Sequence, residues 1–310
     1  MILMHAWKPG IKVGPQNYQE NLGRSHAKYC EVWYRVDREG EYTDMFSYLQ
    51  EHGIHAGLHF WAMLQDKIAP NLAYPDEKIW KPSLELMQKN LEIAAKHHHA
   101  YVNIHVGNAA LEKMDLDRHK SMPIEHTVVD YHLAERTAEK NILTLQTYAK
   151  KLGVLLIIET VPPYDPEGWD SDQNPNARLH AHATHALSNV FVEHLGKDLG
   201  IAINNDISHT AAELITNDRE QLWQYLYART VALAPYTKLI HANTMAEPFN
   251  GTDSHDGILD SDFAHNVFPS KLQFEKLLSV FQSRDDVWIV NEPQRDHVQN
   301  YNALVAFHQS

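Results

Sequence analysis

The residues best suited to chemistry stand at the ends of short apolar segments. The chain contains 22 histidines, nearly as many as its 27 lysines and arginines together. A histidine or a carboxylate lies at the end of each of six consecutive apolar segments, and these residues are His59, His105, Glu159, Asp206, His241 and Glu292. His209 follows shortly after Asp206, and Asp253 and His255 follow the segment that ends at His241.

A mixed set of imidazoles and carboxylates suits a divalent metal ion. A lone histidine is most often a hydrogen-bonded core or rim residue. Six segment ends in a row favour a metal centre instead. Carboxylates and neutral imidazoles brought together without lysine or arginine would repel one another and desolvate poorly unless cations held them. Because the set contains no cysteine thiolate, it suits Zn²⁺, Mn²⁺ or a related ion such as Co²⁺.

Other histidines are predicted to be solvated surface residues. These are His97, His98 and His99, which follow a predicted helix, and His180, His182 and His185, which lie in a helix-like stretch. A histidine at the end of a helix is mildly favoured by the helix dipole. We therefore expect substitution of these residues to leave metal binding unaffected.

Short apolar segments alternate with longer amphipathic ones. The short segments have the β-branched content of buried parallel strands. We predict strands at Ile2–Trp7, Cys30–Val36, Ile54–Phe60, Tyr101–Val106, Val154–Glu159, Gly200–Asn205, Lys238–His241 and Val287–Val290. Helical spacing of apolar residues predicts helices at Thr43–His52, Pro82–Lys96, Tyr131–Leu152, Arg219–Leu233 and Ser270–Ser283.

Eight strands alternating with helices predict a (β/α)₈ TIM barrel or a long doubly wound sheet. The glycine fingerprint of a dinucleotide-binding sheet is missing after the first strand, which favours a single TIM-barrel domain over residues 1–310. In such a barrel the carboxyl ends of the strands form one face. The histidines and carboxylates at the strand ends are therefore predicted to converge there.

Composition and charge restrict the class of protein. A hydrophobic content of 44% describes a globular chain that can bury a full core. The formal charge of −13 disfavours a broad nucleic-acid-binding face. Cys30 is the only cysteine, which suits a reducing compartment and predicts a cytoplasmic location. No apolar run reaches the roughly 20 residues that span a bilayer, so we expect no membrane association through such a segment.

The motifs at the strand ends resemble those of the xylose isomerase-like TIM barrel superfamily. This superfamily includes endonuclease IV and many sugar and sugar-phosphate isomerases and epimerases. The resemblance extends from His59 to Glu292, and its motifs are IHVG at 104–107, IET at 158–160, DISH at 206–209, IH at 240–241, TDSH at 252–255 and NEP at 291–293.

The resemblance implies ligand sets for one to three ions. In endonuclease IV the matching positions bind three zinc ions, which implies one ion at His59, His105 and Glu159, a second at Glu159, Asp206, His241 and Glu292, and a third at His209, Asp253 and His255. In the isomerases and epimerases one ion is held by the equivalents of Glu159, Asp206, His241 and Glu292. There the equivalent of His209 touches the substrate instead.

Departures from endonuclease IV favour a small substrate. The loop after the second predicted strand, Arg35–Tyr42, has nearly cancelled charges where endonuclease IV carries a basic and aromatic loop that enters damaged DNA. Arg35 and Arg38 suit either a phosphate or surface ion pairs with Asp37 and Glu39, and surface pairs are favoured. The long loop Val161–Arg178 is predicted to cover a small substrate.

The favoured interpretation is therefore a divalent-metal-dependent isomerase or epimerase of a sugar or sugar phosphate. The ion would stabilise an enediolate, Glu159 and Glu292 would serve as general acid and base, and His209 would orient a substrate oxygen. The alternative is an endonuclease IV-type trinuclear zinc phosphoesterase. A barrel that only binds a ligand is disfavoured because every ligand position is filled. Trp61 and Trp169 suit either a pocket wall or a dimer contact, which leaves a homodimer open.

Overall fold

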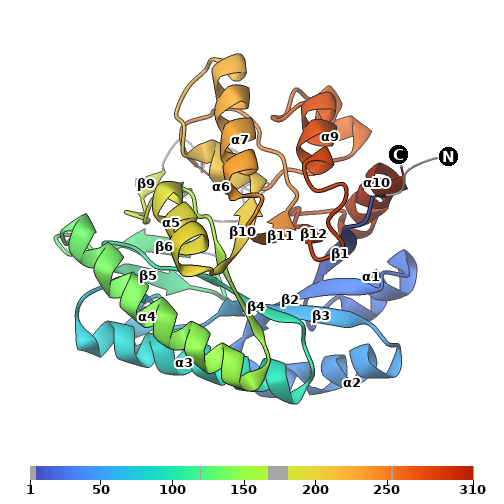
Figure 1. The fold of residues 1–310 in the computed structure, drawn as a ribbon. Coiled ribbons are helices and arrows are strands. Elements are labelled where there is room, and N and C mark those ends of the chain that lie inside the picture. Colours follow the sequence, from blue (N-terminus) through green and yellow to red (C-terminus); the bar gives the residue numbers. More distant parts are fainter. Residues whose placement is uncertain (1–4, 119, 167–180, 253, 310) are drawn as a thin grey trace.

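Eight parallel strands form a closed barrel. The computed structural model describes residues 5–118, 120–166, 181–252 and 254–309. The strands follow one another around the barrel in the order β1-β12-β11-β10-β7-β4-β3-β2 (Figure 1). Their bounds are β1 Lys8–Val13, β2 Tyr29–Arg35, β3 His55–Trp61, β4 Tyr101–His105, β7 Leu155–Glu159, β10 Ala202–Asp206, β11 Thr237–His241 and β12 Trp288–Asn291. The predicted TIM barrel is confirmed.

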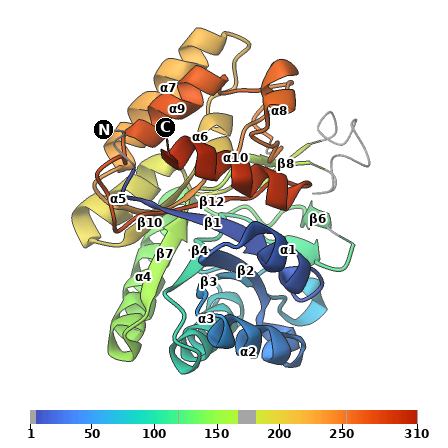
Figure 2. The same ribbon diagram turned by 90° about the vertical axis from the view of Figure 1, so that its right-hand side faces the viewer.

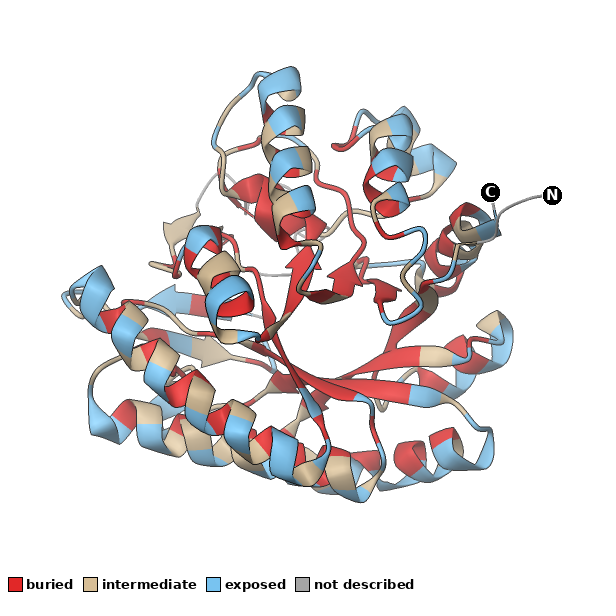
Figure 3. Ribbon diagram, in the orientation of Figure 1, coloured by how far each residue is buried: buried red, intermediate tan, exposed pale blue. Residues whose placement is uncertain are grey.

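Helices surround the barrel, and most of them bury one face against it. The α-helices are α1 Tyr18–Ser25, α2 Thr43–Glu51, α3 Glu77–Lys96, α4 Tyr131–Leu152, α5 Asn189–Leu199, α6 Ile207–Ala212, α7 Arg219–Leu233, α8 Asp260–Ala264, α9 Lys271–Ser279 and α10 His297–Gln309. Figure 2 shows α10 and α1 on the side of the barrel where β1 lies. The strands are buried almost throughout, whereas the helices alternate between buried and exposed residues (Figure 3).

Helix α4 shows why the helical predictions succeed. Its buried residues include Ala134, Ala138 and Ile142, whose spacing places them on one face. The Asp130 side chain accepts a hydrogen bond from the Leu133 N–H at 2.9 Å and caps the first turn. Gly153 ends the helix at a φ of 72°, a left-handed conformation that glycine adopts readily.

The first strand was placed too early. The prediction put it at Ile2–Trp7, but β1 runs over Lys8–Val13. Its sequence KPGIKV holds proline, glycine and two lysines, all of which favour turns or surfaces over buried strands. The other seven predicted strands are confirmed to within two residues at either end. The difference matters because Lys12 then lies on a strand of the barrel.

Two small antiparallel hairpins join the loops at the carboxyl ends of the strands. Strands β5 (Glu112–Asp115) and β6 (Lys120–Pro123) pair after β4, and β8 (Tyr164–Asp165) pairs with β9 (His182–Ala183) after β7. Isolated bridges join Asn108 to Ala186 and Tyr164 to Thr252. The loops after β4, β7 and β11 are thus tied to one another. Among the helices of the described ranges, none combines the length and apolarity needed to span a membrane.

Candidate metal centre

The barrel brings together the histidines and carboxylates that the sequence analysis singled out. His105, Glu159, Asp206 and His241 are the last residues of β4, β7, β10 and β11. Within the described residues, five groups of side chains have potential ligand atoms within 4.8 Å of one another. Three of them consist of residues predicted from the strand ends: His59, His105 and Glu159; Glu159, Asp206, His241 and Glu292; and Asp206, His209 and His255. The other two are Glu31, His59, His241 and Glu292, and Glu112, Asp165 and His182. Asp253 lies outside the described residues.

The second group forms a buried quartet around one imidazole nitrogen. His241 Nδ1 lies 2.8 Å from Glu292 Oε2, 3.1 Å from Glu159 Oε1 and 3.4 Å from Asp206 Oδ2. The four side chains are between 0% and 6% exposed. Three carboxylates that converge on one imidazole nitrogen form a ligand set suited to a divalent ion. The residues present therefore fit such an ion.

The charges of the quartet shift the pKa values of its members. Burial alone would raise the pKa of Glu159 and Glu292, but neighbouring cationic groups, His241 among them, hold both pKa values well below their usual range. Burial likewise opposes protonation of His241, yet the surrounding carboxylates raise its pKa well above its usual value. Either a proton on His241 or a divalent ion can thus offset the repulsion between the carboxylates.

The first group leaves two imidazole nitrogens without hydrogen bonds. His59 Nε2 and His105 Nε2 lie 3.4 Å and 3.6 Å from Glu159 Oε2. Both nitrogens are buried and have no hydrogen-bond partner among the described residues. Glu159 Oε2 accepts a hydrogen bond from Asn103 Nδ2 at 2.5 Å. The geometry of this group on its own is compatible with an ion.

The third group is held in place by backbone contacts. The Nδ1–H of His209 donates to the Thr160 carbonyl at 2.8 Å, which leaves His209 Nε2 facing His255 Nε2 at 3.2 Å. His255 Nε2 also lies 3.4 Å from Asp206 Oδ2. Asp206 Oδ1 accepts from the His209 backbone N–H at 2.9 Å and so begins α6. The carbonyl contact fixes the tautomer of His209, as second-shell hydrogen bonds do in metal sites.

Two charged residues of the centre escaped the sequence analysis. Lys12 on β1 and Glu31 on β2 are both fully buried, and their side chains are 2.5 Å apart. The assumption that lysine and arginine are absent from the cluster was therefore wrong. A single charge inside an apolar strand, as in Cys30-Glu31-Val32, is the sequence signal that could have revealed Glu31. Lys12 was missed because the first strand was predicted at Ile2–Trp7, which does not contain it.

Contacts with Lys12 and Glu31 link the two strands to the quartet. Lys12 Nζ lies 2.8 Å from Glu292 Oε1 and 2.7 Å from His59 Nδ1. Glu31 Oε1 lies 3.0 Å from His241 Nε2, and Glu31 Oε2 accepts from the Tyr101 hydroxyl at 2.7 Å. Burial would lower the pKa of Lys12, but the neighbouring carboxylates more than offset this and raise it. Burial, and then the Lys12 charge, lower the pKa of His59.

Aromatic side chains line the centre. Trp33 Nε1 donates to Glu292 Oε1 at 2.8 Å. The Trp61 ring packs 5.3 Å from the His59 ring and 5.5 Å from the His105 ring, between centroids, and so belongs to the wall of the site. The His105 side chain is 35% exposed, whereas the quartet is buried, so the centre opens to solvent beside His105.

Arg35 and Arg38 make surface ion pairs. Arg35 contacts Asp37 at 2.7 Å and Asp117 at 2.7 Å, and Arg38 contacts Asp117 at 2.6 Å. The favoured surface-pair interpretation is correct, although Asp117 takes the place expected for Glu39. The loop predicted to cover the substrate falls mostly outside the described residues, as does Trp169.

Two of the predicted surface histidines are placed differently. His99 is buried, packs 4.7 Å from the Phe46 ring, and has its pKa lowered to about 3 by burial and by its neighbouring histidines. His182 belongs to β9 and lies 3.3 Å from Glu112. His180 lies outside the described residues. Sequence alone did not reveal these environments because tertiary packing creates them.

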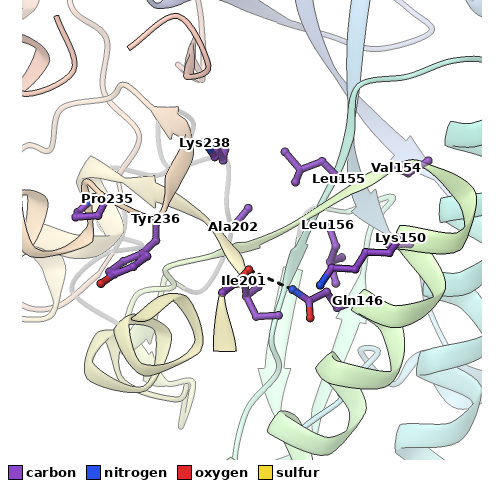
Figure 4. A pocket seen from close by; sticks show the side chains of 12 residues that line it. Gln146, Lys150, Val154, Leu155, Leu156, Ile201, Ala202, Pro235, Tyr236 and Lys238 are labelled. Carbon is purple, nitrogen blue, oxygen red and sulfur yellow. Dashed lines mark hydrogen bonds between the residues drawn. The ribbon is translucent and has the colours of Figure 1, made fainter. Parts of the chain in front are cut away.

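One pocket in the described part of the chain lies away from this centre. It measures about 250 Å³ and is lined by residues including Leu155, Ala202 and Lys238, at the amino ends of β7, β10 and β11 (Figure 4). Gln146 Nε2 donates to the Gly200 carbonyl at its edge at 3.2 Å. The histidines and carboxylates lie at the opposite ends of the same strands. This pocket therefore has no part in the centre.

Comparison with known proteins identifies the fold. No protein family and no curated protein sequence matches the chain. A D-tagatose 3-epimerase-like protein superposes with a TM-score of 0.65 over 96% of both chains at 13% identity. Endonuclease IV from Thermus thermophilus gives 0.57 over 96% of this chain and 97% of its own at 15% identity. A xylose isomerase domain protein from Planctomyces limnophilus gives 0.55 over 97% and 96% at 13% identity.

This chain shares the TIM-barrel fold of these three proteins. The resemblance stated from the motifs is thereby confirmed at the level of the fold. Epimerases and an endonuclease share this fold, so the fold by itself does not decide between the two chemistries.

Proposed function

We propose that the protein is a divalent-metal-dependent isomerase or epimerase of a sugar or sugar phosphate. The observation that carries this proposal is the order of the quartet around the barrel. Strands β11 and β10, which carry His241 and Asp206, lie between β12 and β7, which lead to Glu292 and Glu159. The two glutamates thus stand on either side of the histidine and the aspartate. A substrate bound at this centre would have one carboxylate on each side.

The two glutamates suit proton transfer on opposite faces of a substrate carbon. A divalent ion held by the quartet would supply Lewis acidity, which makes a hydrogen next to a substrate carbonyl easier to remove. One glutamate takes that proton and the other delivers a proton to the opposite face, which inverts the carbon. Glu292 Oε1 already accepts hydrogen bonds from Lys12 and Trp33. Oε2 is therefore the oxygen of Glu292 that is left for proton transfer.

His209 is suited to orient a substrate oxygen. Its Nδ1–H donates to the Thr160 carbonyl, which fixes the ring and directs Nε2 toward His255 Nε2 at 3.2 Å. The half-buried rings of Trp33 and Trp61 would exclude water around an apolar face of a sugar ring. A small polyhydroxylated substrate matches this combination of apolar walls and a few fixed polar groups.

One observation favours the second candidate, a zinc phosphoesterase of the endonuclease IV type. Three of the five groups of potential ligands match the ligand sets implied by that resemblance, except that the third group contains Asp206 and that Asp253 lies outside the described residues. Two other observations count against it. The formal charge is −13, and the arginines of the loop after β2 are engaged by Asp37 and Asp117. A DNA-binding enzyme needs positive charge that is available to phosphates.

The test is exchange of solvent deuterium into a panel of ketoses and ketose phosphates. The metal-loaded protein is incubated in deuterium oxide, and carbon-bound deuterium and product sugars are measured by mass spectrometry and chromatography. We expect exchange and product with at least one sugar. Glu159→Gln and Glu292→Gln should each reduce the rate by about 100-fold or more, as loss of a general acid or base does. Asp117→Asn, on the surface, should leave the rate unchanged.

The same preparations are tested with a duplex that contains an abasic site. We expect no metal-dependent cleavage at catalytic protein concentrations and no binding at physiological salt. Cleavage of the duplex, together with no exchange or product in any sugar, would reverse the ranking of the two functions.

A further inference from the structure

We propose that the buried Lys12–Glu31 pair fixes the proton positions of two histidines, so that His241 binds the ion whereas His59 does not. The inference deepens the proposed function, on which it rests for an ion at the quartet. It excludes an ion from the group His59, His105 and Glu159, which the resemblance to endonuclease IV implies as a binding site. Lys12 and Glu31 are positioning residues in this account because they act through the two histidines.

The first step concerns His241. Its Nε2 lies 3.0 Å from Glu31 Oε1. An ionised carboxylate only accepts hydrogen bonds, so the Nε2 atom carries a proton and donates it. The neutral imidazole then has its lone pair on Nδ1, the atom that faces Glu292, Glu159 and Asp206. This arrangement of carboxylate, histidine and metal position is the one that orients histidine ligands in metalloproteins.

The second step concerns His59 and has the opposite outcome. Its Nδ1 lies 2.7 Å from Lys12 Nζ. The Glu31 Oε1 atom also faces Nδ1 but lies farther away, at 3.4 Å, so the ammonium is the nearer partner. An ammonium group only donates hydrogen bonds, so Nδ1 of a neutral His59 carries the lone pair and Nε2 the proton. Nε2 is the atom that faces Glu159 Oε2, at 3.4 Å. An ion in this group would need a lone pair on Nε2, but that position holds a proton.

The third step shows why Lys12 cannot easily turn away. Its Nζ lies 2.5 Å from Glu31 and 2.8 Å from Glu292, and its side chain is fully buried. A buried ammonium that loses its carboxylate partners is very costly. Moving the proton of His59 to Nδ1 would bring two donors face to face at the 2.7 Å contact. The lysine therefore excludes the tautomer that an ion at His59 requires.

Glu31 is itself held in one orientation. Its Oε2 accepts from the Tyr101 hydroxyl at 2.7 Å, which leaves Oε1 for Lys12 and His241. The Tyr101 ring reaches this position across Gly57, where a Cβ atom would lie 2.1 Å from the ring. The carboxylate that directs the two histidines is thus fixed by neighbours on β4 and β3.

The experiment counts metal ions in matched histidine variants. Wild type, His59→Gln and His241→Gln are loaded with zinc or cobalt, and bound metal is measured by elemental analysis, affinity by calorimetry and cobalt geometry by visible absorption. We expect His59→Gln to keep the wild-type ion count, cobalt spectrum and affinity to within about threefold. His241→Gln should weaken binding by about 100-fold or more, since even outer-shell changes cost 10- to 100-fold.

A second variant removes the lysine together with one of its two carboxylate partners. Lys12→Met combined with Glu31→Gln frees His59 Nδ1 from the ammonium and takes the carboxylate away from His241. We expect this double variant to weaken binding at the quartet and to permit an ion at His59 and His105, seen as a cobalt spectrum that His59→Gln then abolishes. If the double variant fails to fold, the comparison of His59→Gln with wild type still decides the matter.

Nitrogen NMR of His59 separates this inference from the proposed function. The chemical shifts should report a protonated Nε2 and an unprotonated Nδ1 in the protein both with and without zinc. Loss of one ion per chain in His59→Gln, or an Nδ1-protonated His59 in the zinc-loaded protein, would overturn the inference even if sugar exchange were observed. Absence of any bound metal, with the expected His59 tautomer, would instead contradict the metal centre of the proposed function.

Discussion

In the proposed metal centre, His241 is the residue at which a proton and a metal ion would compete. The neighbouring carboxylates, Glu159 foremost, raise its pKa well above the usual value against the effect of burial. An ion can bind Nδ1 only after the proton on that atom has left. Metal affinity therefore falls as the pH falls, and the raised pKa extends this competition into the neutral range.

We therefore expect zinc affinity to increase steadily from pH 6 to pH 8, by up to about tenfold per pH unit where one proton is displaced. Calorimetry in buffers of different ionisation enthalpy measures both the affinity and the number of protons released. The carboxylates of the quartet do not produce this trend, because their pKa values are lowered and they are ionised throughout this range. A flat affinity profile with no proton release would show that His241 is not a ligand.

Individual site residues were largely predictable, whereas their balance of charge was not. The structure describes all but one of the residues predicted at the strand ends and in the loops after them, and every one that it describes lies in the three groups. This is because parallel strands bring their carboxyl ends together. Lys12 and Glu31 carry no comparable signal, since a lysine between isoleucine and valine in a segment with proline and glycine resembles a surface residue. Their presence changes the chemistry, because an ammonium now lies inside a cluster that was expected to need cations.

At the scale of elements, strands were predictable where their residues are apolar and β-branched. β1 was not, because Pro9 and Gly10 weaken its strand signal while the apolar run Ile2–Trp7 precedes it. The barrel nevertheless requires an eighth strand between β2 and β12, and β1 pairs with both. Closure of the sheet overrides local propensity at this position. The small hairpins were missed because they are only two to four residues long on each side.

Gly57 tests how tightly the elements hold the site. It lies on β3, and a Cβ atom there would overlap the Tyr101 ring at 2.1 Å. We expect Gly57→Ala to displace Tyr101 from Glu31 and to lower the free energy of unfolding by about 1–3 kcal/mol, the usual cost of overpacking a core. Urea unfolding measures this loss, and zinc titration measures the accompanying loss of affinity.

Gly23→Ala is the matched control for this change. Gly23 lies on an exposed face of α1, and among the described residues no atom outside the adjoining backbone of its own helix lies within 4 Å of the position that a Cβ would take there. Alanine in a helix is favoured over glycine by about 0.5–1 kcal/mol, so this variant should be slightly more stable and should bind zinc normally. If both variants behaved alike, Tyr101 would have room to move and would not fix Glu31.

At the scale of the whole molecule, the barrel accounts for the candidate site, and the net charge supports the proposed class of substrate. Closure of eight strands places ligands from residues 59 to 292 at one end of the barrel. The negative formal charge of −13 disfavours a polyanion such as DNA and leaves a small, largely neutral or singly phosphorylated substrate as the better match. The fold was predictable from alternating strands and helices, but substrate choice depends on loops that vary within it.

The central claim is that one divalent ion is held by Glu159, Asp206, His241 and Glu292. A crystal of the zinc- or manganese-loaded protein, measured on both sides of the absorption edge of the metal, locates bound ions directly by anomalous scattering. We predict a strong peak contacted by all four residues, with His241 bound through Nδ1 and no peak beside His59 Nε2. Absence of a peak at the quartet, or a strong peak held by His59 and His105, would contradict this account.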